Sequence, residues 1–196
     1  MDPVRRRRRM TTTSVLPPGQ REVRKWPRLD LGIVPRFDPK EWDFGVDGEA
    51  DAPLRLTIDE FRALPATRVT SPFHCVTGWT TFDNLWEGVT IRELADRARI
   101  RDIARFATFH CADGYTTSHP LEVLYDDDVL MVWTWDGKPL PVEHGGPVRL
   151  LVPKRYAYKS AKWVRRIAFT APEELGYWEV RGYSNTADPR TEDRYA

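Results

Sequence analysis

Cys75 is one of only two cysteines in the chain, and its neighbours are typical of a reactive turn. It follows His74 directly, and Pro72 and Gly78 flank the pair. These residues predict a strand-like run that delivers the thiol to a tight turn. A lone cysteine is more often a small buried hydrophobic residue than a reactive group. The rest of the chain must therefore decide whether Cys75 does chemistry.

Two other roles for the cysteine, as the nucleophile of a hydrolase or as a zinc ligand, are only weakly supported. In a cysteine hydrolase His74 would be the base, but adjacent residues in extended backbone point to opposite faces. A zinc site would draw on Cys75, Cys111 and the four histidines, and none of them has the close paired spacing of structural zinc sites. His110 and Cys111 are adjacent, which is awkward for a shared metal. Both readings stay open as weaker alternatives.

A second group of residues has the character of an anion site. Basic and imidazole side chains follow residue 140 around a Gly-Gly turn, namely His144, Arg149, Lys154, Arg155, Lys159 and Lys162. A solvated basic face is the ordinary explanation. However, the glycines expose backbone N–H groups between a histidine and an arginine, which suits a phosphate. A thiolate and a phosphate clamp together predict a cofactor with a soft metal end and a phosphate end.

The elements that must position these residues are mostly strands. Alternating or apolar runs predict strands at 41–46, 54–56, 103–109, 129–135 and 161–169. Capping boxes at 57–60 and 90–93 predict short helices at 61–64 and 91–98. The Asp136-Gly137 pair predicts a hairpin turn. Because the order is no regular βαβ alternation, we expect a single domain of the α+β class, predominantly β.

The domain organisation predicted from composition has three parts. Residues 1–20 are predicted to be a disordered basic tail, and 21–170 the folded domain. Residues 171–196 are predicted to be a C-terminal extension packed on that domain. No phosphate-cradling Gly-x-Gly-x-x-Gly or P-loop motif occurs.

Charge and hydropathy narrow the partners and the compartment. A net charge of +1 argues against nucleic acid as a partner. The longest apolar run, 129–135, falls far short of the roughly 20 residues of a membrane helix, so no membrane segment is expected. The Arg5–Arg9 run lacks a following apolar stretch, so it is no export signal and we expect a cytoplasmic protein.

Four motifs, in one order, resemble a known family. They are Phe73-His-Cys-Val-Thr-Gly-Trp79, Asp113-Gly-Tyr-Thr-Thr-Ser118, His144-Gly-Gly-Pro-Val-Arg-Leu-Leu-Val-Pro153 and Tyr156-Ala-Tyr-Lys-Ser-Ala-Lys-Trp163. Together they resemble the molybdopterin-binding domain of the sulfite oxidase family. The resemblance is closer to its short bacterial branch, which includes the catalytic subunit of the periplasmic methionine-sulfoxide reductase.

The resemblance implies a fold, a cofactor and a set of roles. It implies the sulfite oxidase-type fold, molybdopterin with molybdenum, and Cys75 as metal ligand and catalytic residue beside a catalytic Tyr115. The implied cofactor-binding residues are His144, Arg149, Ser160, Ala161, Lys162 and, on a looser alignment, Thr108. The implied reaction is two-electron oxygen-atom transfer on a small-molecule substrate, with electrons exchanged with a separate partner. A non-catalytic molybdopterin-binding module or subunit is the alternative.

The chain also departs from that family in one place that affects the substrate. Sulfite oxidases carry an arginine in the extended segment that corresponds to 29–35, whereas Asp30 stands here and would repel an anion. Sulfite is therefore disfavoured. We further expect Trp79 to line the pocket and His74 to face away. His110 and His119 flank the loop that bears Tyr115, and an approach of either to the site is the weaker alternative.

Overall fold

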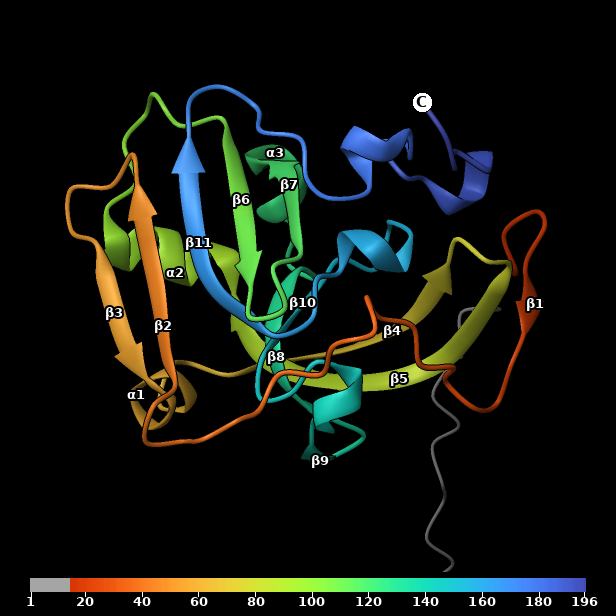
Figure 1. Cartoon of the computed structure of the whole chain (residues 1–196), viewed down its shortest axis with the longest axis horizontal. Helices are drawn as coiled ribbons and strands as arrows, with labels where there is room; N and C mark the ends of the chain where they lie inside the picture. Colours follow the sequence, from red (N-terminus) through yellow and green to blue (C-terminus); the bar gives the residue numbers. More distant parts are fainter. Residues whose placement is uncertain (1–14) are drawn as a thin grey trace, which may run out of the picture.

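A computed structural model describes residues 15–196, and two β-sheets form most of it (Figure 1). The Arg5–Arg9 run and most of the predicted basic tail lie outside the described residues. The predicted class, α+β and predominantly β, is confirmed. No helix within residues 15–196 is both long and apolar enough to cross a membrane.

One sheet has five strands in the order β3-β2-β11-β6-β7. The strands are β2 (Asp43–Gly48), β3 (Leu54–Thr57), β6 (Phe106–Cys111), β7 (Thr116–Pro120) and β11 (Val164–Thr170). β11 runs parallel to β2 and antiparallel to β6. Since β2 comes early in the chain and β11 late, this pairing closes the fold over long sequence distances.

The other sheet has six strands and carries the cysteine. Its strands are β1 (Arg21–Glu22), β4 (Thr67–Cys75), β5 (Trp79–Thr90), β8 (Leu130–Trp135), β9 (Lys138–Pro139) and β10 (Arg149–Leu151). β4 and β5 form a long hairpin whose turn begins after Cys75. The Gly78 N–H donates to the Cys75 carbonyl at 3.0 Å, and Gly78 has a φ of +91°. The predicted strand-to-turn geometry at the cysteine is confirmed.

The helices are short and begin where the sequence supplies caps. They are α1 (Ile58–Arg62), α2 (Ile91–Ala98), α3 (Leu121–Leu124) and the 3₁₀ turns η1 (Val142–His144), η2 (Ala157–Lys159), η3 (Glu179–Arg181) and η4 (Pro189–Thr191). The capping box at Thr57 has both reciprocal hydrogen bonds, and Thr90 caps α2 through the Glu93 N–H. The predicted helix at 61–64 is three residues too late, because the chain becomes helical directly after its cap.

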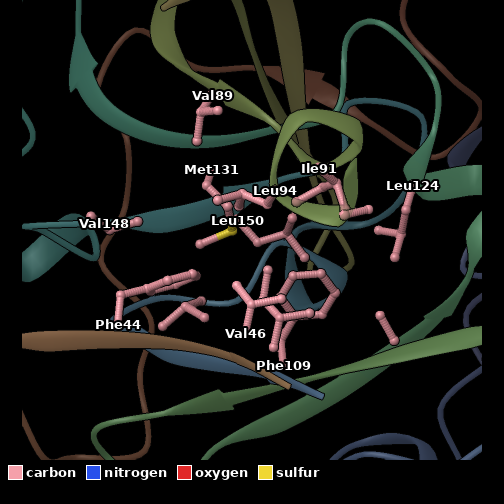
Figure 2. Close-up of a cluster of buried hydrophobic side chains, with 14 of the residues drawn as sticks. Phe44, Val46, Val89, Ile91, Leu94, Phe109, Leu124, Met131, Val148 and Leu150 are labelled. Carbon is pink, nitrogen blue, oxygen red and sulfur yellow. The ribbon is translucent and has the colours of Figure 1, made fainter. Parts of the chain in front are cut away.

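The main core lies between the two sheets. Figure 2 shows side chains of β2 and β6 facing those of β8, β10 and α2, with Phe44, Phe109 and Met131 among them. These three residues are fully buried. The helix predicted at 91–98 turns its apolar face, with Ile91 and Leu94, into this core. Such two-sided burial is the main source of stability in a fold of this type.

The C-terminal segment packs back onto the sheets, and Figure 1 shows it above η2 and the β4–β5 hairpin. Its anchor is a buried ion pair in which Lys159 Nζ lies 2.6 Å from Glu179 Oε1, each side chain 1% exposed. Lys159 also donates to the Ser118 carbonyl and to Asn185 Oδ1. The division of the chain at residues 20 and 170 stays a prediction.

Candidate active site

A cavity of about 340 Å³ opens where the β4–β5 turn, the 26–31 segment, η2 and the C-terminal segment meet. The structure brings seven of the predicted site residues into its lining: Cys75, Tyr115, His144, Arg149, Ser160, Ala161 and Lys162. They come from segments up to 87 positions apart in the chain, from Cys75 to Lys162. Trp79 also lines the cavity, as predicted.

Cys75 presents its thiol to the cavity from the last position of β4. Its residue is 4% exposed, and Sγ lies 3.1 Å from Thr77 Oγ1. Burial raises the pKa of this thiol above its ordinary value, and the Thr77 contacts oppose that rise. A thiol so buried becomes a thiolate when a cation is bound beside it, because the metal stabilises the charged form.

Arg149 supplies a buried positive charge on the cavity wall. Its guanidinium, in a residue 3% exposed, donates to the carbonyls of His144 at 2.7 Å and Ser160 at 2.6 Å. Trp26 and Phe73 present their rings to the same guanidinium. Burial lowers the pKa of Arg149 to about 9. No carboxylate of residues 15–196 pairs with it, so the charge is free to attract an anion from the cavity.

Lys162 and the Gly-Gly turn stand next to Arg149. Gly145 has a φ of +107°, and a Cβ there would lie 3.0 Å from Cβ atoms of both Arg149 and Lys162. Only glycine therefore allows the turn to approach both cations. Lys162 Nζ lies 3.7 Å from an Asp30 oxygen, and burial lowers the pKa of Lys162 to about 8. His144, on the same turn, stacks on Trp26 with ring centroids 4.4 Å apart.

Tyr115 lines the cavity, but its hydroxyl already has a partner. The hydroxyl donates to the Tyr158 carbonyl at 2.6 Å. Burial raises the pKa of Tyr115 well above its ordinary value, so the phenol keeps its proton. In this arrangement Tyr115 holds η2 in place. Its predicted catalytic role stays a prediction and requires the hydroxyl to exchange this carbonyl for a substrate.

Thr108 does not reach the cavity, so its predicted role as a cofactor-binding residue is not supported. The register of β6 places Thr108 opposite Ser118 of β7 and Ala168 of β11, in the middle of the five-stranded sheet. Its hydroxyl lies 3.4 Å from Glu174 Oε2.

The histidines other than His144 lie outside the cavity lining. His74 faces away from the thiol as predicted; its Nδ1 lies 2.8 Å from Thr80 Oγ1, and burial lowers its pKa to about 4. His119 Nε2 donates to the Lys159 carbonyl at 2.8 Å. Neither His110 nor His119 lines the cavity, so the weaker alternative, in which they approach it, is not supported. Both stand on strands of the other sheet.

Sequence reasoning missed three aromatic residues of the cavity wall. Trp26 comes from the segment after β1, and Trp178 and Tyr183 come from the C-terminal segment. The two latter rings lie 5.1 Å apart. The aromatic character of that segment was visible in the sequence, but nothing local indicated that it folds back over the cysteine turn.

The stability of the fold should fall in acid because His119 is buried neutral. Burial lowers its pKa well below the value near 6.5 that it has in the unfolded chain. Below pH 6.5 the unfolded chain therefore binds a proton that the folded chain excludes, and stability falls by about 1.4 kcal/mol per pH unit from this group. Urea unfolding at pH 7.5 and pH 5 measures the loss. His119→Gln keeps a donor for Lys159 and should lose less stability; an equal loss would contradict this assignment.

Comparison with known proteins identifies the family. Residues 31–178 match the family described as "Oxidoreductase molybdopterin binding domain". The chain belongs to this family. The stretch covers all of the cavity except its Trp26–Asp30 edge and Tyr183. The sequence resemblance to the molybdopterin-binding oxidoreductases of the sulfite oxidase family is thereby confirmed.

Two relatives in sequence and one solved structure resemble this molybdopterin-binding oxidoreductase. It is 36% identical over 181 residues to the oxidoreductase YuiH of Bacillus subtilis, covering 92% of the chain and 91% of YuiH. It is 26% identical over 170 residues to the catalytic subunit MsrP of the protein-methionine-sulfoxide reductase of Campylobacter jejuni, covering 78% and 57%. The sulfane dehydrogenase SoxCD of Paracoccus pantotrophus shares the fold, with a TM-score of 0.65 at 22% identity over 71% of this chain and 40% of that one.

The cavity of this molybdopterin-binding oxidoreductase fits such a cofactor on chemical grounds. A soft thiol lines it at Cys75, and Arg149 lines it as a buried cation that has no carboxylate partner among residues 15–196. Gly145 opens the backbone beside that cation. A soft thiolate suits a dithiolene-bound metal, and the cation with the open glycine backbone suits a phosphate.

Replacing Arg149 with glutamine should release the cofactor. Charge-assisted hydrogen bonds contribute about 1.5–3 kcal/mol each, so cofactor affinity should fall about 10- to 100-fold. The measurement is pterin fluorescence per protein chain after oxidation of the purified sample. Arg166→Gln is the matched control, since that side chain is exposed and pairs only with Asp47 among the described residues. Wild-type pterin content in Arg149→Gln would exclude the proposed phosphate contact.

Proposed function

We propose that this protein is a molybdenum-dependent oxidoreductase that binds one molybdopterin. The reaction is two-electron redox with oxygen-atom transfer on a small substrate, and a separate partner exchanges the electrons. The observation that carries the proposal is the convergence of the Cys75 thiol and the uncompensated Arg149 cation on one cavity. We also propose the cytoplasm as its compartment, which subcellular fractionation tests.

Different residues of the cavity would hold the two ends of the cofactor. Cys75 contributes a thiolate ligand to the metal, oriented by the β4–β5 turn. The phosphate end is held by Arg149, Lys162 and His144, together with Ser160 and Ala161, which directly follow η2. Ser160 Oγ accepts from the Val152 N–H at 2.9 Å, which fixes η2 against the strand that bears Arg149. When bound, the cofactor supplies the redox chemistry, and the protein sets its orientation and surroundings.

The distribution of charge favours a neutral substrate. The charged residues of the cavity are interlinked around Lys162, which contacts Asp30 and the Glu143 carbonyl. The cavity lining next to the thiol offers Thr77 and Trp79 instead. Arg149 is committed to carbonyls and the cofactor. Asp30 lies on the cavity wall, paired with Arg28 and Lys162. Since Asp30 occupies Lys162, the described residues next to the thiol leave no cation for an oxyanion, and a sulfoxide or N-oxide suits the site better.

A substrate screen tests this proposal. Purified protein loaded with cofactor is assayed with small sulfoxides, N-oxides and sulfite, using an artificial electron donor or acceptor. In the reductive direction each sulfoxide takes two electrons and two protons and yields a thioether and water. We expect turnover of a neutral substrate at least about tenfold above that of sulfite, the scale of one lost charge contact. Turnover of sulfite alone would contradict the substrate class, and bound cofactor without any turnover would favour the non-catalytic alternative.

A further inference from the structure

The cysteine turn is held from one side by the segment that contains β1. Gln20 Nε2 donates to the Cys75 carbonyl at 3.1 Å. The Arg21 N–H donates to the Gly78 carbonyl at 3.0 Å, and the Val23 N–H to the Thr80 carbonyl at 2.9 Å. Three successive contacts therefore lock the turn onto this segment, and Figure 1 shows β1 beside the end of the β4–β5 hairpin.

The orientation of Gln20 is itself fixed by a buried relay. Thr80 Oγ1 donates to Gln20 Oε1 at 3.2 Å and accepts from His74 Nδ1 at 2.8 Å. With its oxygen engaged by Thr80, the Gln20 amide must point its NH₂ group at Cys75. His74, which faces away from the thiol, thus acts on the turn through Thr80 and Gln20.

Arg194 holds the turn from the other side. Its Nη1 donates to the Val76 carbonyl, the first carbonyl after the cysteine. The guanidinium lies 5.5 Å from the centre of the Tyr156 ring and 3.4 Å from Glu192 Oε1. The side chain is only 23% exposed. Charge-assisted bonds to a carbonyl are among the stronger hydrogen bonds, so this contact restrains the peptide next to Cys75.

The two sides meet across a glycine. A Cβ at Gly19 would lie 2.2 Å from Glu192 Oε1 and 2.9 Å from Arg194 Nη2. A Cβ at Gly78 would lie 3.2 Å from the Gly19 carbonyl. Gly19, just before β1, therefore lies against both the cysteine turn and the end of the Arg194 side chain. Any side chain at Gly19 would push these groups apart.

We infer that Gln20 and Arg194 are positioning residues for the Cys75 ligand. The turn between β4 and β5 has one internal backbone hydrogen bond, from Gly78 to Cys75, and Thr77 Oγ1 contacts Cys75 Sγ within the same turn. Both contacts move with the turn, so they do not by themselves fix its position relative to the rest of the cavity. Gln20 and Arg194 restrain two successive carbonyls, those of Cys75 and Val76, and so hold the two peptides that flank Val76. We call the Gln20 and Arg194 contacts to the turn the clamp. Both residues lie outside the 31–178 stretch that matches the family, so the clamp is formed by segments that flank the family domain.

The inference rests on the proposed function only in naming Cys75 as the metal ligand. Its test uses the full chain with Arg194→Met, Arg194→Lys and Gln20→Met, and Arg190→Met as the matched control. Arg190 is exposed, belongs to the same segment, and its side chain makes no hydrogen bond within the described residues. The first readout is hydrogen exchange of residues 76–80 in metal-free protein. The second is the thiolate-to-metal absorption band of cofactor-loaded protein, with molybdenum and pterin content measured in parallel.

The clamp predicts a graded result. Arg194→Met and Gln20→Met should each raise exchange of the turn amides about fivefold or more, the effect of one lost hydrogen bond. Each should also shift or broaden the absorption band while pterin content stays near wild type. Arg194→Lys should recover part of both effects, and Arg190→Met should match wild type.

Two outcomes would overturn the clamp. One is wild-type exchange and absorption in both methionine variants, and the other is an equal change in Arg190→Met. Absence of molybdenum and pterin from every sample would instead overturn the proposed function, while the exchange data would still decide the clamp. Should Arg194→Met fail to fold, Gln20→Met and Arg194→Lys give the same decision from opposite sides of the turn.

Discussion

The Cys75→Ser variant should lose at least about 100-fold in turnover while it keeps its pterin. Residues that only orient a metal ligand already change metal affinity or activity by about 10- to 100-fold, so loss of the ligand itself should cost at least as much. A serine hydroxyl in the Cys75 position stays protonated at neutral pH and offers a hard oxygen in place of a soft thiolate. The phosphate end of the cavity is formed by residues that this change does not touch. Steady-state turnover and pterin content on the same sample separate the two effects.

Cys111→Ser is the matched control for the cysteine. Cys111 ends β6 in the five-stranded sheet and does not line the cavity. Burial raises the pKa of its thiol well above the ordinary value, as expected of a structural cysteine. This variant should keep wild-type turnover. If Cys75→Ser retained turnover, or if Cys111→Ser lost it, the assignment of the metal ligand would be wrong.

Lys159→Met should destabilise the metal-free protein by about 3–5 kcal/mol, because it leaves the Glu179 carboxylate buried without its cation. The ion pair spans 2.6 Å with both side chains 1% exposed. Glu179 Oε1 also accepts from Thr117, but its Oε2 has no partner within the described residues. Urea unfolding monitored by tryptophan fluorescence gives the free energy of unfolding.

The effect should be larger than the loss of one ion pair because Lys159 joins several segments. Its Nζ donates to the carbonyl of Ser118, on the edge strand β7 of the five-stranded sheet, and to Asn185 Oδ1 of the C-terminal segment. Lys154→Met is the control, since its pair with Asp126 is formed by a side chain 61% exposed and should cost less than about 1 kcal/mol. The Lys159→Met, Glu179→Leu double variant should regain much of the stability. Equal costs in Lys159→Met and Lys154→Met would refute this account.

Local sequence signals were sufficient to predict several helices and turns and the residues at which they begin or end. The Thr57 box and the Asp136-Gly137 pair each act within a few residues, and both residues of that pair have positive φ. The helix at 91–98 was predicted with its observed bounds because its apolar spacing is unambiguous. Strand bounds shifted by up to three residues at 103–109 and 161–169, since the ends of strands depend on their partners.

The same distinction explains which parts of the site were predictable. Backbone alternation alone placed His74 and Cys75 on opposite faces. The motif around Arg149 carried its own glycines and cations, so its place in the cavity wall could be predicted locally. Trp178 and Arg194 reach the cavity and the cysteine turn only through the long-range folding of the C-terminal segment. The buried ion pair between Lys159 and Glu179 anchors that segment, and no local sequence pattern predicts this pair.

The most direct test of the central claim is the molybdenum and pterin content of the full chain after expression in a host that makes the cofactor. Cys75 and Arg149 on one cavity wall predict one molybdenum and one molybdopterin per chain, retained through gel filtration. Protein that is folded and yet holds neither would contradict the account.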